Sequence, residues 1–529
     1  MQPLQPTTRS LLWKSVFLCA LCLILLSGII LTACETTPEQ VSSDVPESAA
    51  QTGESSEAPA GNKYQDADGR YTLQNIGMPE FSFSEKEFRV CVTSNEQATT
   101  YFSEEIGYDM YDTTDTVLNE AVKTRNHLVE EQYDVTIVAV PVKVVATSVR
   151  EDATASTNQY DAAMPYMPAC GNLALEGLLL DLTHYGNYIH LDAPWWDQGA
   201  NQSLSIGGHL YFTVGDISIM QKITSTAITF NKTMYAEQLE DTYGDLYQMV
   251  RDHKWTLDTM YAMGRAVTAD TDGVLGMTSD DTFGLSSSSG DSTVYYLASG
   301  EHLITKDAND LPQLYIGTTE SSITTAQKVL SILTTGDEWL MNCEEYQGKV
   351  SDIWVLSLDV FGENRCLFRT TRFSAIKKLR NYDNASDFGI VPMPLINDTQ
   401  EEYCTPSAST EAFGICIPVS APNPEFSAYM IEAMCCLAKN TITPAYYEVT
   451  LKHRDSKDAE SEEMLDHYIF NHVSYDPGMV FGFGLTYLMN SLYTNKSTDI
   501  VSKLDANRSS IETTIKEFID AYEKNSAAK

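Results

Sequence analysis

The sequence predicts an α/β fold with two lobes, on the basis of two observations. Residues 88–92 are apolar and strand-like, residues 115–132 place apolar side chains on one helical face, and residues 134–140 are again strand-like. A strand, a helix and a strand in this order form a βαβ unit, which implies a parallel sheet covered by helices. About 470 of the 529 residues follow the N-terminal region, which is too many for one ordinary core.

The N-terminal segment 1–33 predicts an export signal. Arg9 and Lys14 precede an apolar run, and the run ends in a lipobox, Leu-Thr-Ala followed by Cys34. An uncleaved membrane anchor is the alternative, but the apolar run is shorter than the ~20 residues that cross a bilayer. We therefore expect a mature chain that begins at a lipid-modified Cys34 on the extracellular face of the cell membrane.

Residues 34–62 consist mainly of Ser, Thr, Glu, Ala and Pro, with few large apolar side chains. Such a segment cannot bury enough surface to offset the entropy lost on ordering. The composition predicts a flexible tether between the lipid and a globular body.

Several further elements are predicted along the body. Residues 160–164 are expected to form a third strand, followed by a helix over 170–179 and a strand over 208–212 that leads out of the first lobe. Thr256 is predicted to cap the start of another helix. A terminal helix is predicted from one apolar stripe, made of Ile511, Ile515, Phe518, Ile519 and Tyr522.

The composition narrows the class of partner. The formal net charge is −39, from 34 basic and 73 acidic residues, and this argues against binding to nucleic acid. The acidity is typical of a solvated, exported surface. Eight cysteines lie in the body without a CxxC pair, which favours mostly free thiols, although disulfides are the alternative for an exported protein.

The search for catalytic and metal-binding motifs finds little. The sequence contains no GxSxG, HExxH, GxxxxGK[ST] or GxGxxG motif, and we predict no cofactor. Asp270, Asp272 and Asp280 form a weak calcium candidate. A surface turn is the better interpretation, because Val274 and Leu275 stand where a calcium loop needs an oxygen ligand and a glycine.

Aromatic residues are frequent in segments that also contain Asp, Asn, Ser and Arg. A sugar presents apolar C–H faces to aromatic rings and hydroxyl groups to polar side chains, so carbohydrate sites combine the two. The alternative is that most of these rings lie in the core. The residues are Trp195, Trp196, Tyr211, Trp255, Tyr295, Tyr296, Trp354 and Phe373.

An ordered series of short segments resembles a known family, the extracellular solute-binding proteins (family 1 type) of carbohydrate ABC importers, in particular the lipoproteins of Gram-positive bacteria. No single segment is specific to the family, but the order and spacing of the segments together are. They are Tyr160-Asp161-Ala162-Ala163-Met164, Gly177-Leu178-Leu179-Leu180-Asp181-Leu182, Pro194-Trp195-Trp196-Asp197, Gly208-His209-Leu210-Tyr211-Phe212, Phe230-Asn231-Lys232, Trp255-Thr256-Leu257 and Phe388-Gly389-Ile390-Val391-Pro392-Met393-Pro394.

The resemblance implies a two-lobed periplasmic-binding-protein-like fold of class II type. Each lobe would be a mixed sheet flanked by helices, with the ligand cleft at the hinge. The first lobe would comprise residues 85–214 plus about 408–480, and the second about 217–405 plus 481–529.

The resemblance also implies a set of ligand-binding positions after strands and crossovers. Asp216 has an alternative role in shaping the hinge, and Arg372 has one in pairing with a carboxylate of the cleft wall. The candidates are Tyr166, Asp216, Trp255, Ser287, Asp291, Tyr295, Arg372, Phe373, Thr410 and Glu411.

These observations lead to one functional hypothesis and three alternatives. The hypothesis is a monomeric, membrane-tethered receptor that captures a carbohydrate, an oligosaccharide in our interpretation, for the membrane subunits of an ABC permease, without catalysis. The alternatives are a receptor for another solute, a sensory role, and an extracellular glycan-processing enzyme. The low content of Arg and Lys disfavours a highly anionic ligand, although Arg372 can serve one carboxylate.

Overall fold

The computed structural model describes residues 62–94, 105–107, 116–379, 382, 387–447 and 458–527. The predicted signal, Cys34 and the tether up to residue 61 lie outside the described residues. The chain from Gly61 to Lys529 forms one compact unit. Within the described ranges, none of the helices combines the length and the apolar character that spanning a membrane requires.

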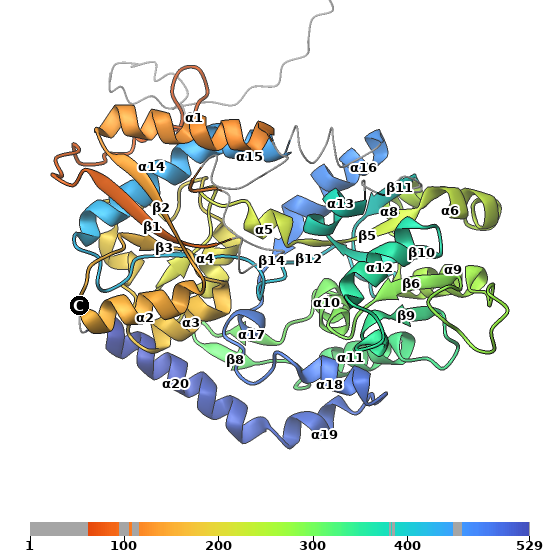
Figure 1. Ribbon diagram of the computed structural model, residues 1–529. Helices are drawn as coiled ribbons and strands as arrows, with labels where there is room; N and C mark the ends of the chain where they lie inside the picture. The colour runs from red at the N-terminus through yellow and green to blue at the C-terminus, as the bar shows by residue number, and fades with distance from the viewer. Residues whose placement is uncertain are drawn as a thin grey trace, which may run out of the picture. The chain divides into compact units, whose positions relative to one another are not determined.

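The first of two five-stranded sheets has the strand order β2-β1-β3-β13-β4 (Figure 1). β1 runs parallel to β2 and β3, whereas β13 is antiparallel to β3 and β4, so the sheet is mixed. The predicted βαβ unit is confirmed as β1, α1 (Thr116–Tyr133) and β2. The strands are β1 (Glu87–Thr93), β2 (Thr136–Val142), β3 (Ala162–Ala163), β4 (Phe212–Thr213) and β13 (Ile415–Cys416).

Helices cover both faces of this sheet, and we call the sheet with these helices the first lobe. Alternate residues of β1 face opposite cores: Val90 packs in a cluster with α1 and α14, and Cys91 packs in a cluster with α2 and α3. This alternation follows from the two-residue period of a strand. The helices are α2 (Val145–Ala155), α3 (Met167–Leu175), α14 (Pro424–Asn440) and α20 (Arg508–Ala527).

The second sheet has the order β11-β5-β10-β6-β9, and we call it and its helices the second lobe. β10, β6 and β9 are parallel, whereas β5 is antiparallel to both β10 and β11. The strands are β5 (Thr226–Asn231), β6 (Phe283–Ser287), β9 (Leu340–Asn342), β10 (Cys366–Arg372) and β11 (Phe388–Val391), and the main helices are α9 (Leu257–Val267), α10 (Asp291–Ala298), α11 (Glu320–Leu333), α12 (Ile353–Gly362) and α16 (Ala459–Met464).

Two glycines allow α9 to lie directly on β6. A Cβ atom added at Gly284 would stand 2.4 Å from the Cα of Gly264, so neither position has room for a side chain. The predicted N-cap of α9 is confirmed, because Thr256 accepts a hydrogen bond from the backbone N–H of Thr259 at 3.2 Å.

The remaining elements connect the lobes or lie at their edges. Two of them, β7 and β8, pair as a hairpin, and β12 pairs with β14. They are η1 (Leu182–Tyr185), α4 (Gln198–Leu204), α5 (Met220–Ile223), α6 (Lys232–Gln238), α7 (Glu240–Tyr243), α8 (Leu246–Arg251), β7 (Ile304–Lys306), β8 (Pro312–Leu314), η2 (Cys343–Tyr346), α13 (Phe373–Leu379), β12 (Thr405–Pro406), α15 (Ile442–Pro444), η4 (Leu465–Ile469), η5 (Phe470–His472), β14 (Val473–Ser474), α17 (Pro477–Val480), α18 (Leu488–Thr494) and α19 (Ile500–Asp505).

Two predicted elements differ from the structure in extent. The helix predicted over 170–179 is α3, which begins earlier because Pro168 occupies its first turn. The strand predicted over 208–212 begins only at Phe212. Gly207 and Gly208 have positive φ angles of 61° and 79° and form a tight turn, so the preceding residues cannot extend a strand.

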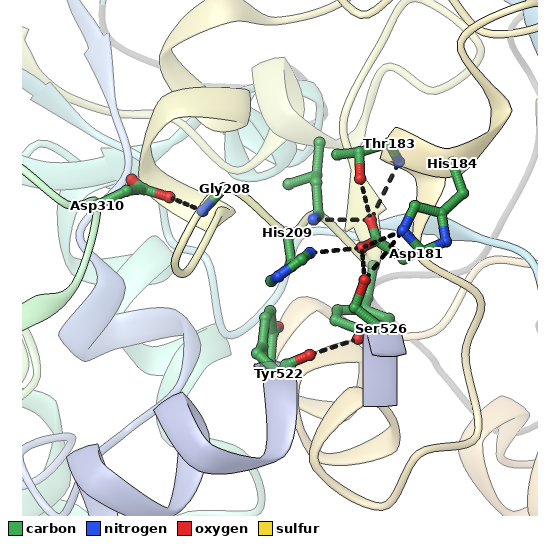
Figure 2. Close-up of polar contacts among 10 residues, drawn as sticks. Asp181, Thr183, His184, Gly208, His209, Asp310, Tyr522 and Ser526 are labelled. Atoms are coloured by element: carbon green, nitrogen blue, oxygen red, sulfur yellow. Dashed lines mark hydrogen bonds and ion pairs between the residues drawn. The ribbon is translucent and has the colours of Figure 1, made fainter. Parts of the chain in front are cut away.

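The terminal helix is confirmed as α20, and its contacts differ from the lobe boundary that we expected. α18 contacts α10 and α11 of the second lobe, whereas α20 contacts α3 of the first lobe. Figure 2 shows how its end is held: Ser526 Oγ donates to Asp181 Oδ2 at 2.6 Å. The same carboxylate oxygen contacts His209 Nδ1 at 2.8 Å.

Candidate ligand-binding site

A cavity of about 260 Å³ lies where the parallel strands of the second sheet end. Ser287 is the last residue of β6, Arg372 is the last residue of β10, and Cys343 follows β9; all three line the cavity. Ligands of α/β proteins usually bind at the carboxyl ends of parallel strands. The position of the cavity therefore follows from the sheet topology.

Other elements complete the wall of this cavity. α10 contributes its first residue, α12 and α13 contribute residues of their first two turns, and the turn before β13 contributes Glu411. The full lining is Ser287, Ser288, Asp291, Cys343, Asp352, Trp354, Val355, Ser357, Leu358, Arg369, Thr370, Arg372, Ser374, Ala375, Lys378 and Glu411. Four of the predicted ligand residues, Ser287, Asp291, Arg372 and Glu411, thus surround one cavity.

Asp291 is held in place by the loop that precedes α10. Its Oδ2 atom accepts hydrogen bonds from Ser287 Oγ and from the backbone N–H of Ser288, each at 2.8 Å. The carboxylate also lies in the first turn of α10, where the helix dipole favours a negative charge. These contacts fix the loop between β6 and α10 as one wall of the cavity.

An ion pair brings the two lobes together at the cavity. Arg372 Nε lies 3.0 Å from Glu411 Oε2. Glu411 is two residues from Phe413, whose ring packs 4.8 Å from that of Tyr166, and Tyr166 follows β3 of the first sheet. Burial and then the charge of Glu411 raise the pKa of Tyr166, but Tyr166 is not one of the residues that line the cavity.

A buried guanidinium lines the cavity. Arg369, on β10, is 7% exposed; its Nε donates to Ser357 Oγ at 3.2 Å and its Nη1 to Thr371 Oγ1 at 3.0 Å. Burial lowers the pKa of Arg369, and the charge of Asp291 opposes that shift. Arg369 was not among the ligand residues predicted from the sequence. The available signal was a cationic residue inside an otherwise apolar and hydroxylated strand, Cys366–Arg372.

An exposed tryptophan lies at the rim. Trp354 is 52% exposed and Val355 is 45% exposed, and both belong to the first turn of α12. Asp352 caps this helix by accepting the backbone N–H of Trp354 at 2.8 Å, which holds the turn in place. Trp354 was noted as one of several aromatic residues but was not chosen as a site residue. Its position directly after a helix cap was the signal that distinguished it.

Three predicted ligand residues lie in the core of the second lobe instead. Trp255 is fully buried and donates its indole N–H to the carbonyl oxygen of Pro392 at 2.9 Å. Tyr295 is buried and bonds Thr370 Oγ1 at 3.1 Å, and Phe373 packs on Phe470 with ring centroids 4.9 Å apart. Their large apolar surfaces are used to pack the sheet against its helices. Thr410, next to Glu411, is half-buried in the turn.

Asp216 lies in a different and smaller cavity of about 160 Å³, which also involves Trp195 and Trp196. Its carboxylate is 3.0 Å from Lys439 Nζ and 3.6 Å from Lys222 Nζ, and it accepts a bond from Thr443 Oγ1 at 2.7 Å. We call this group the hinge cluster, because residue 216 lies in the segment that leads from β4 to β5. Its contacts agree with the alternative role of shaping the hinge.

The carboxylates that lie together near the predicted calcium candidate are not the three that the sequence suggested. Asp270 and Asp272 gather with Asp281, whereas Asp280 lies 3.9 Å from Arg365. Asp281 accepts backbone N–H bonds from Thr271, Asp272 and Thr278, which lower its pKa together. Backbone donors satisfy this carboxylate, as the interpretation of the segment as a turn predicts.

A larger cavity, of about 430 Å³, lies beside the edge strand β9. Its lining comes from β9, the end of α11 and α18, and it includes none of the predicted ligand residues. The cavity at the ends of β6 and β10 is lined by residues of the second lobe and by Glu411, which precedes β13 of the first lobe. We therefore take it as the candidate site.

Comparisons with known proteins identify the fold. No protein-family model matches the chain, and a search of curated proteins finds no match either. Among solved structures, a cyclo/maltodextrin-binding protein complexed with maltotetraose aligns with a TM-score of 0.51 at 13% identity, over 84% of this chain and 98% of that chain.

Two further structures align over similar lengths. An ABC substrate-binding protein from Listeria monocytogenes in complex with cycloalternan has a TM-score of 0.51 at 12% identity, over 82% of this chain and 100% of that chain. UgpB from Mycobacterium tuberculosis, in complex with glycerophosphocholine, has a TM-score of 0.50 at 12% identity, over 83% and 100%. The chain therefore has the two-lobed periplasmic-binding-protein fold, and the predicted α/β class with mixed, helix-flanked sheets is confirmed.

Proposed function

We propose that this protein is a solute-binding receptor that captures a carbohydrate in the cavity at the ends of β6 and β10. In this proposal Ser287, Asp291, Arg372 and Glu411 contact the solute, and Tyr166 closes the cavity from the first lobe. The two-lobed fold supports the proposal, and two of the aligned proteins hold oligosaccharides in their structures. The receptor performs no catalysis.

The observation that carries the proposal is the exposed ring of Trp354 at the rim of a polar cavity. Burial of apolar surface stabilises a protein by about 25 cal/mol for each Å² removed from water. An indole that remains in water does not gain this stabilisation. A sugar ring stacked on Trp354 recovers that burial through its C–H face, while its hydroxyl groups reach the carboxylates and hydroxyls of the wall.

We further propose that the receptor delivers its solute to an ABC permease from the outer face of the cell membrane. The sequence supports this through the lipobox at Cys34 and the tether that follows it. Mass spectrometry of the protein from the membrane fraction should find a lipid-modified Cys34 as the first residue; an unmodified chain that keeps its first 33 residues would contradict the anchor.

Calorimetric titration with a panel of mono- and oligosaccharides tests the binding role. The Trp354→Ala variant should bind the best ligand about 30-fold more weakly, a change of ~2 kcal/mol that is usual for an aromatic residue central to a binding site. Leu275→Ala, which shortens an even more exposed apolar side chain that is not part of the cavity lining, should bind like the natural protein.

Three outcomes of the same titration would contradict the proposal. No heat with any sugar, but binding of peptides, would point to a receptor for another solute. Shortened oligosaccharides recovered after incubation would point to a glycan-processing enzyme. Equal affinities of Trp354→Ala and the natural protein would remove the proposed stacking surface.

A further inference from the structure

Arg369 is a buried arginine that has no carboxylate partner in the described part of the chain. Among the residues that the structure describes, no carboxylate oxygen lies within 4.0 Å of its guanidinium. Both of its bonded partners, Ser357 and Thr371, are neutral hydroxyl groups. A guanidinium has five N–H donors, so most of the donors of Arg369 are unused by these two bonds.

The absence of a partner is not due to a shortage of acidic residues, because the chain has 73 acidic and 34 basic residues. Most other arginines have found such a partner. The pairs are Arg89 with Asp161, Arg150 with Glu176, Arg251 with Glu463, Arg265 with Asp337, Arg365 with Glu363, Arg372 with Glu411, and Arg508 with Asp505.

A buried charge without a partner is costly, because removing an ion from water is not offset by attraction to an opposite charge. Arg125, which is also buried, likewise donates only to neutral acceptors among the described residues, the carbonyl oxygen of Glu105 and Asn126, but it is not part of the cavity lining. Arg369 instead lines a cavity that a solute can enter. The free energy that the unpaired guanidinium costs is recovered if the solute supplies the anion.

We infer that the cavity takes a sugar bearing a carboxylate, such as a uronic acid unit, and that the carboxylate binds Arg369. This inference rests on the proposed carbohydrate-binding function and specifies its substrate class. A planar carboxylate matches the fork of N–H donors on a guanidinium and can accept two parallel hydrogen bonds from it.

The charge of the wall favours a single negative charge on the ligand. Asp291, Asp352 and Glu411 oppose Arg369, Arg372 and Lys378, so the lining is neutral in sum. A doubly charged phosphate would meet three carboxylates. Two lining cations have no carboxylate partner among the described residues, and of these Lys378 is exposed, so Arg369 is the one buried guanidinium that can bind the anion. A uronic acid places one carboxylate on Arg369 and leaves the ion pair of Arg372 and Glu411 in place.

The size of the cavity sets how much of the ligand it holds. About 260 Å³ is slightly below the ~300 to 1,000 Å³ usual for pockets that enclose drug-sized ligands. The cavity therefore encloses one acidic sugar unit, and neighbouring units of an oligosaccharide extend past Trp354 at the rim.

A comparison of matched ligands tests the inference. The natural protein is titrated with oligomers of galacturonic or glucuronic acid, with their neutral counterparts and with phosphorylated sugars. The acidic oligomer should bind at least about tenfold more tightly than the neutral one, as expected for a hydrogen-bonded charged pair. Phosphorylated sugars should bind more weakly than the acidic oligomer.

Variants at position 369 then assign the preference to this residue. Arg369→Gln should lose the preference for the acidic oligomer while still binding the neutral one, and Arg369→Lys should retain part of it. Arg265→Gln is the matched control, because Arg265 lies on α9 and is not part of the cavity lining. Circular dichroism of each variant shows whether it is folded.

The outcomes separate the two proposals. Binding of neutral and acidic oligomers with equal affinity by the natural protein would overturn the inference and leave the carbohydrate receptor intact. A preference that persists in folded Arg369→Gln would also overturn it. Binding of no sugar, acidic or neutral, would overturn the receptor role itself.

Discussion

Two polar cavities of this protein contain buried or partly buried cations, and they differ in how those cations are paired. In the hinge cluster, the carboxylate of Asp216 lies between Lys222 and Lys439 and also accepts a bond from Thr443. In the candidate ligand site, Arg369 contacts only hydroxyl groups among the described residues. Each cavity contains residues that the sequence predicted to bind solute, Asp216 in the first and Asp291 and Arg372 among those in the second.

The difference separates a structural role from a binding role. Charges that satisfy one another need no solute and contribute to the folded state, whereas an unmatched charge at a cavity lowers stability until an anion binds. The same contrast gives opposite expectations for variants of the two cavities.

The largest effect is expected for Asp216→Ala. Removing this carboxylate leaves Lys222 and Lys439 close together without their counter-charge, and we expect the free energy of unfolding to fall by about 3 kcal/mol. Urea denaturation measures the change. Asp520→Ala, which breaks an exposed pair with Lys516, is the control and should cost less than about 0.5 kcal/mol. A similar fall in the free energy of unfolding in both variants would contradict the structural role of Asp216 in the hinge cluster.

A smaller effect of opposite sign is expected for Arg369→Met in the absence of ligand. The variant removes an unpaired buried charge and should raise the free energy of unfolding by about 1 kcal/mol. Ser357 and Thr371 keep hydroxyl partners, Ser286 and Thr229, so no polar group loses its only bond. The measurement is again urea denaturation; a clear loss of stability would mean that Arg369 supports the fold.

The smallest effect is a pH dependence outside both cavities. A side-chain hydrogen bond to Asp476 raises the pKa of His302 above its ordinary value of 6.5. The protonated ring therefore adds stability that is fully present below pH 6.5 and is lost as the pH rises through the folded pKa. At pH 5.5 the free energy of unfolding of the natural protein should exceed that of His302→Gln by less than about 1 kcal/mol, because half of the ring is exposed. Unfolding at pH 8.5 should show no difference; an equal difference at both pH values would contradict the linkage.

Much of the fold could be predicted from the sequence, because its signals are local. The βαβ unit of β1, α1 and β2 followed from hydrophobic periodicity, and the start of α9 followed from the cap at Thr256. The two-residue strands β3 and β4 were predicted at greater length. Strands this short are fixed by neighbours from distant parts of the chain, such as β13, which periodicity does not reveal.

The candidate site was predicted only in part, for a related physical reason. Ser287 and Arg372 could be found because each ends a recognisable strand. Arg369 and Trp354 were not predicted, because their sequence signals are weak and their importance depends on what they lack in the fold: a carboxylate partner for the first and a covering side chain for the second. Trp255, which was predicted to bind ligand, is fully buried, since aromatic character alone does not distinguish a packed ring from an available one.

The path of the chain between the lobes has a consequence for cooperativity. After α14 packs on the first lobe, α16 contacts β11 of the second; α17 then contacts α3, α18 contacts α10, and α20 returns to α3. Neither lobe is thus built from one continuous segment, and melting of either removes contacts that complete the other. Heating should therefore disrupt both lobes in a single all-or-none transition.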